Sequence, residues 1–224
     1  MPSFVQQLVL LVSLLVAAPV LGQSGPPRDP KASRQADLVE LVTLDPTIKL
    51  DIRYATTNNF TKQVVYSEAR AFLQRPAAQA LLAAHRELAR QGYGLMIHDG
   101  YRPWTITKKF WDVTAGTPMR DFVANPKTGS KHNRGCAVDL TIYDLATGQI
   151  VQMPGDYDES TQRSFPDFKG GTQAQRARRD LLRAAMEKQG FTVESNEWWH
   201  FNYKDWPSYP ILDISFQDAA KSKR

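Results

Sequence analysis

Two short segments of the chain combine residue types that can bind a metal ion and activate a water molecule. Residues 130–139 include His132 and Asp139, and residues 197–200 include Glu197 and His200. Two imidazoles and one carboxylate form a typical ligand set for a catalytic zinc, whose fourth position is kept for water. A nearby glutamate that does not bind the metal can accept a proton from that water. These residues therefore predict a metal-dependent hydrolase.

The spacing of the two histidines by itself leaves a second interpretation of each one open. His132 falls among Gly, Ser and Asn residues, which favour a loop, where a lone histidine is commonly solvated. Gly135 would let such a loop turn back toward Asp139. His200 is surrounded by Trp198, Trp199 and Phe201, so it could instead be a histidine packed inside the core.

Five ordered blocks of sequence decide between these interpretations, because together they resemble one family of enzymes. The pattern Ser-x-His-x-x-Gly-x-Ala-x-Asp, followed by Glu-x-Trp-His, resembles the zinc peptidases that cleave D-alanyl peptides. Within that superfamily, which includes the D-Ala-D-Ala carboxypeptidases, the chain is more similar to the VanX-type D-alanyl-D-alanine dipeptidases. The resemblance covers most of residues 38–205, and its blocks are 51–61, 100–103, 139–148, 153–158 and 197–200.

This resemblance implies a role for each matching residue. It implies one zinc ion per chain, bound by His132, Asp139 and His200, with Glu197 as the general base. The other implied roles are transition-state stabilisation by Arg102, contact with the substrate ammonium by Asp158, and positions at the substrate pocket for Ser130 and Tyr54. Without the resemblance, Arg102 would be interpreted as a surface arginine before a helix.

Two positions depart from the family pattern or lie at a variable point in it. Pro154 stands where the family usually has Gly, so the loop that carries Asp158 is expected to differ in shape. Cys136 is the only cysteine and cannot form an internal disulfide. We interpret it as a packed small hydrophobic residue, with an adventitious metal ligand or an oxidation-prone thiol as the alternatives.

The predicted function is hydrolysis of the dipeptide D-alanyl-D-alanine to two D-alanines in cell-wall peptide metabolism. One alternative is a D,D-carboxypeptidase or endopeptidase that acts on peptidoglycan stem peptides. Another is a zinc-stabilised module that binds cell-wall peptides without turnover. The expected partner is a small D-amino-acid dipeptide; the sequence leaves the oligomeric state open. Nucleic acid is not expected despite the net charge of +5, because Arg176, Arg178, Arg179 and Arg183 suit a solvated helix face.

The first 37 residues are expected to lie outside the folded domain. Residues 1–22 contain an apolar run from Leu8 to Leu21 and predict a signal peptide, hence an exported, periplasmic or secreted protein without stable membrane insertion. Residues 1–7 contain no Lys or Arg, which leaves an uncleaved anchor as the alternative. Residues 23–37 predict a flexible linker, residues 38–215 the zinc domain, and residues 216–224 a basic tail.

The periodicity of residues 38–215 predicts a single α+β domain. Helices are expected from Pro76 to about Gln91, from Pro103 to Asp112, and from Gln173 to Gln189. Strands are expected within residues 39–50, 95–98, 137–143, 191–193 and 198–203. Helices before and after these strands favour a small, mostly antiparallel sheet with flanking helices and with the zinc site on the sheet.

Overall fold

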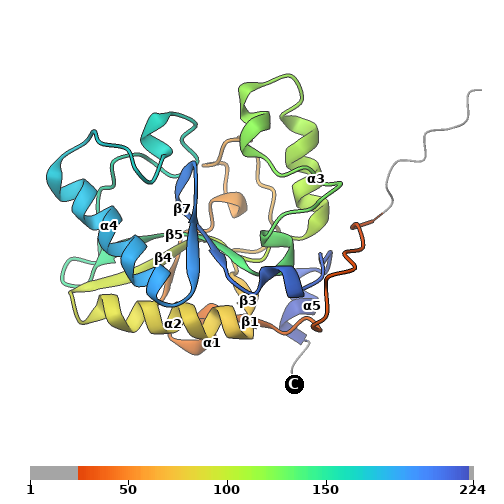
Figure 1. Cartoon of the computed structure of the whole chain (residues 1–224), viewed down its shortest axis with the longest axis horizontal. Helices are drawn as coiled ribbons and strands as arrows, with labels where there is room; N and C mark the ends of the chain where they lie inside the picture. Colours follow the sequence, from red (N-terminus) through yellow and green to blue (C-terminus); the bar gives the residue numbers. More distant parts are fainter. Residues whose placement is uncertain (1–24, 222–224) are drawn as a thin grey trace, which may run out of the picture.

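The computed structural model describes residues 25–221, which form a five-stranded sheet flanked by helices (Figure 1). The strand order is β2-β4-β5-β7-β6, and only the pair β2 and β4 is parallel. A separate antiparallel pair, β1 with β3, lies beside it. The strands are β1 (Leu38–Glu40), β2 (Lys49–Leu50), β3 (Phe72–Gln74), β4 (Tyr93–Asp99), β5 (Ala137–Asp144), β6 (Phe191–Glu194) and β7 (Glu197–Tyr203). The predicted α+β class with a mostly antiparallel sheet is confirmed.

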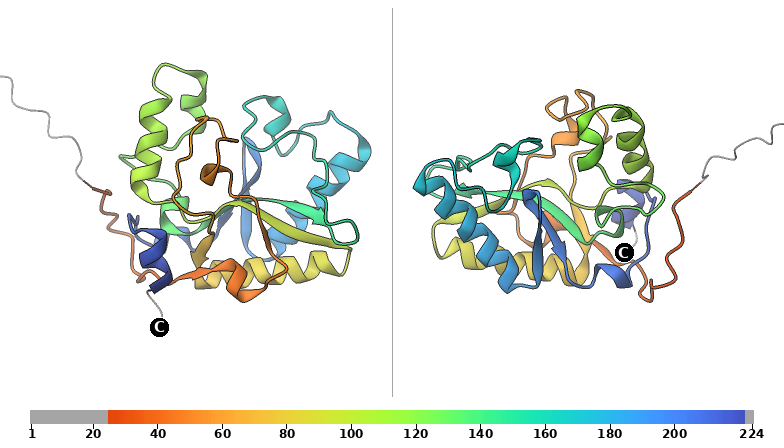
Figure 2. Two further views of the ribbon diagram at one scale, coloured as in Figure 1. Left: turned by 180° about the vertical axis from the view of Figure 1, so that it is seen from behind. Right: turned by 45° about the horizontal axis from the view of Figure 1, so that its top comes forward.

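The helices divide between the two faces of the sheet. The long helices α2 (Arg75–Ala89) and α4 (Gln173–Lys188) pack against one face, whereas α3 (Trp104–Val113) and the long loops lie on the other (Figures 1 and 2). Two shorter helices are α1 (Leu41–Leu44) and α5 (Phe216–Lys221). The 3-10 turns are η1 (Arg53–Ala55), η2 (Pro118–Phe122), η3 (His132–Arg134), η4 (Gln162–Ser164) and η5 (Trp206–Ser208).

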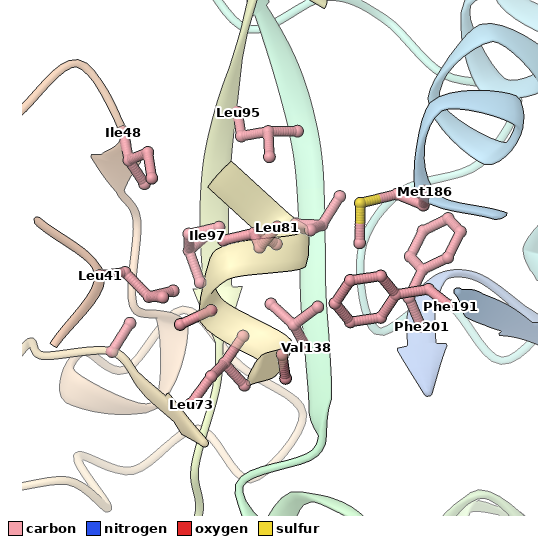
Figure 3. Close-up of a cluster of buried hydrophobic side chains, with 14 of the residues drawn as sticks. Leu41, Ile48, Leu73, Leu81, Leu95, Ile97, Val138, Met186, Phe191 and Phe201 are labelled. Carbon is pink, nitrogen blue, oxygen red and sulfur yellow. The ribbon is translucent and has the colours of Figure 1, made fainter. Parts of the chain in front are cut away.

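Side chains of the central strands point alternately into the hydrophobic core and toward the candidate site. Figure 3 shows Val138 of β5 and Phe201 of β7 packed beneath Leu81 of α2. Successive side chains of a strand point to opposite faces, so their neighbours Asp139 and His200 point away from this core. Asp139 therefore lies on the face of β5 opposite to the buried side chains of Leu140 and Ile142.

Most predicted elements are present with small shifts, but the segment 39–50 is not a continuous strand. It forms β1, then the one-turn helix α1, then the two-residue strand β2. The amide of Leu41 donates to the carbonyl of Ala71, and the side chain of Leu41 is fully buried. Burial of Leu41 therefore requires a bend after β1, which a straight strand would not allow.

Both ends of the described chain are attached to the domain. In the segment predicted as a flexible linker, Asp29 pairs with Arg134 at 2.6 Å and Arg34 pairs with Asp205 at 2.9 Å. At the other end, Phe216 of α5 stacks on Phe72 with ring centroids 5.9 Å apart. The apolar side of α5, with Phe216 and Ala219 buried, thus packs on the core beyond residue 215, where the predicted zinc domain ends.

The predicted signal peptide, residues 1–22, lies outside the described residues. Across residues 25–221, no helix combines the length and apolar character needed to cross a membrane.

Candidate metal centre and catalytic cavity

Three side chains from two strands and one turn meet on the open face of the sheet. Asp139 of β5 lies directly opposite His200 of β7 in the antiparallel register. His132 comes from η3, which ends at Gly135 with φ +65°, a conformation that favours glycine. The side chain of Asn133 holds this turn, because it donates to the carbonyl of Arg102 at 2.8 Å. The interpretation of His132 as a solvated histidine is therefore wrong: it is only 2% exposed.

The three potential ligand atoms form a nearly equilateral triangle. His132 Nε2 lies 3.2 Å from His200 Nδ1 and 3.3 Å from Asp139 Oδ1, and His200 Nδ1 lies 3.0 Å from the same oxygen. Ligands about 2.0–2.1 Å from a tetrahedral zinc lie about 3.3 Å from one another. Asp139 Oδ1 is also a buried oxygen without a hydrogen-bond partner in the described structure. The geometry and the N/O donor set thus fit zinc.

Hydrogen bonds outside the triangle fix which nitrogen of each imidazole faces it. His132 Nδ1 lies 2.8 Å from the carbonyl of Gly100, and His200 Nε2 lies 2.8 Å from Asn202 Oδ1. Both acceptors require a protonated ring nitrogen, which leaves the opposite nitrogen free to bind a metal. Asn202 in turn donates from Nδ2 to Glu194 at 3.0 Å, and Glu194 pairs with Lys131 at 2.9 Å. The carboxylate of Glu194 thereby determines the orientation of the Asn202 amide.

The electrostatics of the triangle favour a cation. Burial opposes ionisation of Asp139, but the imidazoles of His132 and His200 hold the pKa of this carboxyl well below its usual range. Burial likewise opposes the charged form of His200, yet Asp139 and Glu197 raise its pKa to about 9. The second oxygen, Asp139 Oδ2, accepts a hydrogen bond from the hydroxyl of Tyr157 at 3.1 Å.

Glu197 lies at the start of β7, beside the triangle. Its Oε2 is 3.6 Å from His200 Nδ1, and its side chain is 16% exposed. Burial raises the pKa of Glu197 to about 7, and the charge of Asp139 acts in the same direction. A carboxylate with such a pKa can both accept and release a proton near neutral pH.

Arg102 is held inside the cavity by Asp99. Its Nε and one terminal nitrogen donate to Asp99 Oδ2 at 3.0 and 2.7 Å, and its guanidinium lies over the rings of Tyr54 and Phe110. Arg102 is 8% exposed, so its interpretation as a surface arginine is wrong. The guanidinium approaches Asp139 Oδ2 to 4.0 Å, which places a positive charge beside the metal ligands.

The remaining predicted residues line the same cavity, whose volume is about 340 Å³. Asp158 adopts φ +60°, and its Oδ1 accepts a hydrogen bond from the hydroxyl of Tyr54 at 3.2 Å. Its other oxygen is buried and lacks a partner in the described structure. Burial, then repulsion from Asp139 and Glu197, raises the pKa of Asp158 to about 8. Ser130 lies at the cavity wall, and its hydroxyl accepts from the amide of His132.

Cys136 lies outside this cavity. Its side chain is fully buried, and burial raises the pKa of its thiol to about 12. These features confirm its interpretation as a packed hydrophobic residue.

The sequence-based prediction missed Asp99, Tyr157 and Asn202, which contact the predicted residues. Asn202 carried a usable signal, because it stands two positions after His200 on a predicted strand and so shares its face. Asp99 precedes the block at residues 100–103 by one residue. Tyr157 carried no periodic signal, since it lies in a loop.

Comparisons with known proteins give matches over most of this chain. A family described as D-Ala-D-Ala dipeptidase matches residues 34–222. A D-alanyl-D-alanine dipeptidase of Escherichia coli (strain K12) is 34% identical over 184 residues, which cover 82% of this chain and 93% of that protein. The protein of the same name from Enterococcus faecium is 36% identical over 189 residues, covering 75% of this chain and 92% of its own length.

Solved structures show more distant likeness. The LdcB LD-carboxypeptidase has 18% identity and a TM-score of 0.44, with coverage of 87% of this chain and 82% of its own. The vancomycin-resistance D,D-dipeptidase VanXYg, in complex with a D-Ala-D-Ala phosphinate analogue, has 17% identity and a TM-score of 0.41, with coverage of 82% and 74%.

Proposed function

Because the chain belongs to the D-Ala-D-Ala dipeptidase family of zinc peptidases, we propose that it hydrolyses D-alanyl-D-alanine to two D-alanines. The observation that carries this proposal is the triangle of His132, Asp139 and His200 beside Glu197. A structural metal site would need no partly buried glutamate at its edge, whereas hydrolysis needs a base there. We assign the activity to cell-wall peptide metabolism.

His132, Asp139 and His200 would hold one zinc ion. When bound, zinc acts as a Lewis acid and lowers the pKa of water to about 7, so that hydroxide is available at neutral pH. Glu197 accepts the proton of the attacking water and delivers it to the leaving nitrogen. Arg102 stabilises the negative oxygen that forms on the scissile carbonyl. Loss of such a donor commonly costs about 3–4 kcal/mol.

Asp158 supports the restriction to a dipeptide. Its unpartnered oxygen is buried in the cavity, and a substrate ammonium would supply both the missing hydrogen bond and the opposite charge. An ammonium beside Asp158 would favour its ionised form and lower its raised pKa. In a longer peptide the same nitrogen is a neutral amide, which cannot compensate the buried carboxylate. Tyr54 positions Asp158, and Ser130 lies at the pocket wall.

The decisive experiment compares three substrates with and without metal. Purified protein should release D-alanine from D-alanyl-D-alanine, and should largely ignore both the N-acetylated dipeptide and a pentapeptide that ends in D-Ala-D-Ala. Removal of zinc should abolish the activity, and zinc should restore it. Cleavage of the pentapeptide at a similar rate would favour a carboxypeptidase. Tight peptide binding without product would favour a binding module.

Asp158→Asn provides a test of the specificity mechanism. This variant should lower kcat/KM for the free dipeptide about 100-fold, because a buried ion pair with the substrate is lost. Its activity on the N-acetylated dipeptide should change little. Equal losses on both substrates would contradict the role of Asp158 as the ammonium ligand.

We further propose that the protein is exported and acts in the periplasm or outside the cell. The support for export is the apolar segment that ends near residue 22. Mass spectrometry of the protein from the cell envelope should give a mature N-terminus close to that position. An intact Met1 in the cytoplasmic fraction would contradict export.

A further inference from the structure

A second cavity, of about 280 Å³, lies on the same face of the sheet as the metal centre. Its volume is close to the lower end of the range for small-molecule sites. Thr141 of β5 lies two residues after Asp139, and Trp198 of β7 lies two residues before His200. Since alternate residues of a strand share a face, both project on the side of the metal ligands. His98, Thr141, Trp198, Tyr157, Arg53 and Arg163 are among the residues that line this cavity.

Both cavities are lined by residues with a buried polar atom that lacks a hydrogen-bond partner in the described part of the chain. Buried side-chain polar atoms nearly always have a hydrogen-bond partner, so each exception calls for an explanation. Among the described residues five such atoms occur, and two of them, Asp139 Oδ1 and Asp158 Oδ2, lie in the catalytic cavity. Two more, Thr141 Oγ1 and Trp198 Nε1, belong to residues that line the second cavity. In the catalytic cavity, these atoms are the ones assigned to the metal and to the substrate ammonium.

The second cavity presents hydrogen-bond donors and positive charge, whereas the unpartnered atoms of the catalytic cavity are carboxylate oxygens. The indole nitrogen of Trp198 can only donate, and the hydroxyl of Thr141 can donate as well. Two guanidinium groups, those of Arg53 and Arg163, line the cavity, against one carboxylate, that of Asp156. Arg53 is engaged by Asp51 at 2.6 Å, whereas the side chain of Arg163 is 51% exposed and pairs with Glu159 at 3.6 Å. A ligand here must offer hydrogen-bond acceptors and tolerate positive charge.

We propose that this cavity is a binding site for a small oxyanion, of which a carboxylate is the class that fits its size and donors. The carboxylate oxygens would accept from Trp198 and Thr141, and Arg163 would neutralise the charge at the open side. Tyr157 stands between the two cavities: it stacks on His98 with ring centroids 4.6 Å apart, and its hydroxyl donates to Asp139. Tyr157 therefore lines the second cavity and also contacts a metal ligand.

The indole N–H of Trp198 provides a direct test by NMR. Full-length, zinc-loaded protein labelled with ¹⁵N is titrated with acetate, D-alanine and inorganic phosphate at constant ionic strength, with chloride as the reference. Trp198→Phe identifies the indole signal by its loss. Acetate should shift this signal saturably in the millimolar range. The D-alanine and phosphate arms establish whether an amino acid or an inorganic anion is the better source of the oxyanion.

Matched variants separate this site from the metal centre. Arg163→Gln and Thr141→Val should each raise the dissociation constant of the anion about fivefold or more, because each removes one hydrogen-bond donor to the anion. Arg86→Gln, which removes an exposed arginine on α2, should leave it unchanged. The indole of Trp199, which lines the catalytic cavity, reports binding at the metal. The proposal is overturned if all three anions leave the Trp198 signal unmoved, if only Trp199 responds, or if Arg163→Gln and Thr141→Val bind as the wild type does.

Discussion

At the scale of single residues, the catalytic cavity concentrates negative charge. Asp139, Asp158 and Glu197 share one cavity, and Arg102 is already paired with Asp99. Burial together with this repulsion raises the pKa of both Asp158 and Glu197. A metal cation beside Asp139 and a substrate ammonium beside Asp158 would each relieve the repulsion. The residues thus favour two positive charges at two separate points, as the dipeptidase proposal requires.

Glu197→Gln should remove the base without removing the metal. The substitution keeps the shape of the side chain but not its ability to accept a proton, so kcat should fall by about 10²–10⁴-fold. Zinc content, measured by atomic absorption, should equal that of the wild type. A variant with near wild-type turnover would show that another group is the base.

Asn202→Ala should weaken zinc binding because it removes the partner of His200. Loss of such a supporting hydrogen bond typically lowers metal affinity about 10–100-fold. Competition with a chromophoric chelator measures the affinity independently of turnover. Thr192→Ala is a matched control, since Thr192 lies opposite Asn202 on β6. Equal affinities for the wild type and Asn202→Ala would contradict this role.

At the scale of elements, the pairing of β5 with β7 creates the metal centre. The register places Asp139 opposite His200, and a slip by one residue would turn His200 toward the core. The apolar partners Val138 and Phe201 hold this register, because they are fully buried on the opposite face. Strand alternation therefore specifies two of the three ligands, whereas the turn η3 supplies the third.

Asp51 connects the end of β2 to β4 and should contribute to stability in a pH-dependent way. The hydrogen bond from His98, then Arg53, holds the pKa of Asp51 at about 2, below its usual value of 3.8. A carboxyl whose pKa is lowered by folding stabilises the folded state at pH values above its pKa in the unfolded chain. This contribution is lost as the pH falls through about 2, the pKa in the folded state. Because the side chain is 33% exposed, the expected contribution is about 1 kcal/mol after screening.

Urea unfolding of Asp51→Asn tests this expectation. The variant should be less stable than the wild type at neutral pH, and the difference should shrink between about pH 5 and pH 2. Asp112→Asn, which removes an exposed partner of Lys108 on α3, controls for the loss of a surface charge. A difference that does not vary with pH would exclude ionisation of Asp51 as the cause.

At the scale of the whole molecule, the sheet has an apolar core on one face and the polar catalytic cavity on the other. Helices α2 and α4 cover one face of the sheet, whereas α3 and the long loops lie on the other (Figure 2). Leu95, Val138 and Phe201 are buried on the face beneath α2 and α4, and Phe110 of α3 lines the catalytic cavity on the other side. The metal centre lies between these layers and joins β5, β7 and η3. Zinc should therefore stabilise the entire domain.

Removal of zinc should lower the melting temperature. A ligand present at about 100 times its dissociation constant stabilises the folded state by about 2.7 kcal/mol, which corresponds to about 5–10 °C for a domain of this size. Calorimetry before and after dialysis against a chelator measures the shift, and added zinc should reverse it. An unchanged melting temperature after verified removal would contradict zinc binding by the folded state.

The sequence predicted the long helices, the strands β4, β5 and β7, and eight site residues, all of which line the catalytic cavity. Helix periodicity and the glycines after α2 and α4 are local signals, so they can be read directly. The bend after β1 and the docking of α5 were missed, because both depend on distant partners: Ala71 for Leu41, and Phe72 for Phe216. Likewise, nothing local in the sequence indicates that Tyr157 contacts Asp139.

By itself, the sequence determined the chemical groups available to this protein and the face of the strand on which Asp139 lies. Residue type and alternation are local properties, and the ordered motifs supplied the expectation of a zinc dipeptidase. Only the tertiary structure decided that His132 is buried and within 3.3 Å of Asp139, and that Glu194 orients Asn202 against His200. It also revealed the second cavity. Distances between segments tens of residues apart depend on packing, which no local pattern encodes.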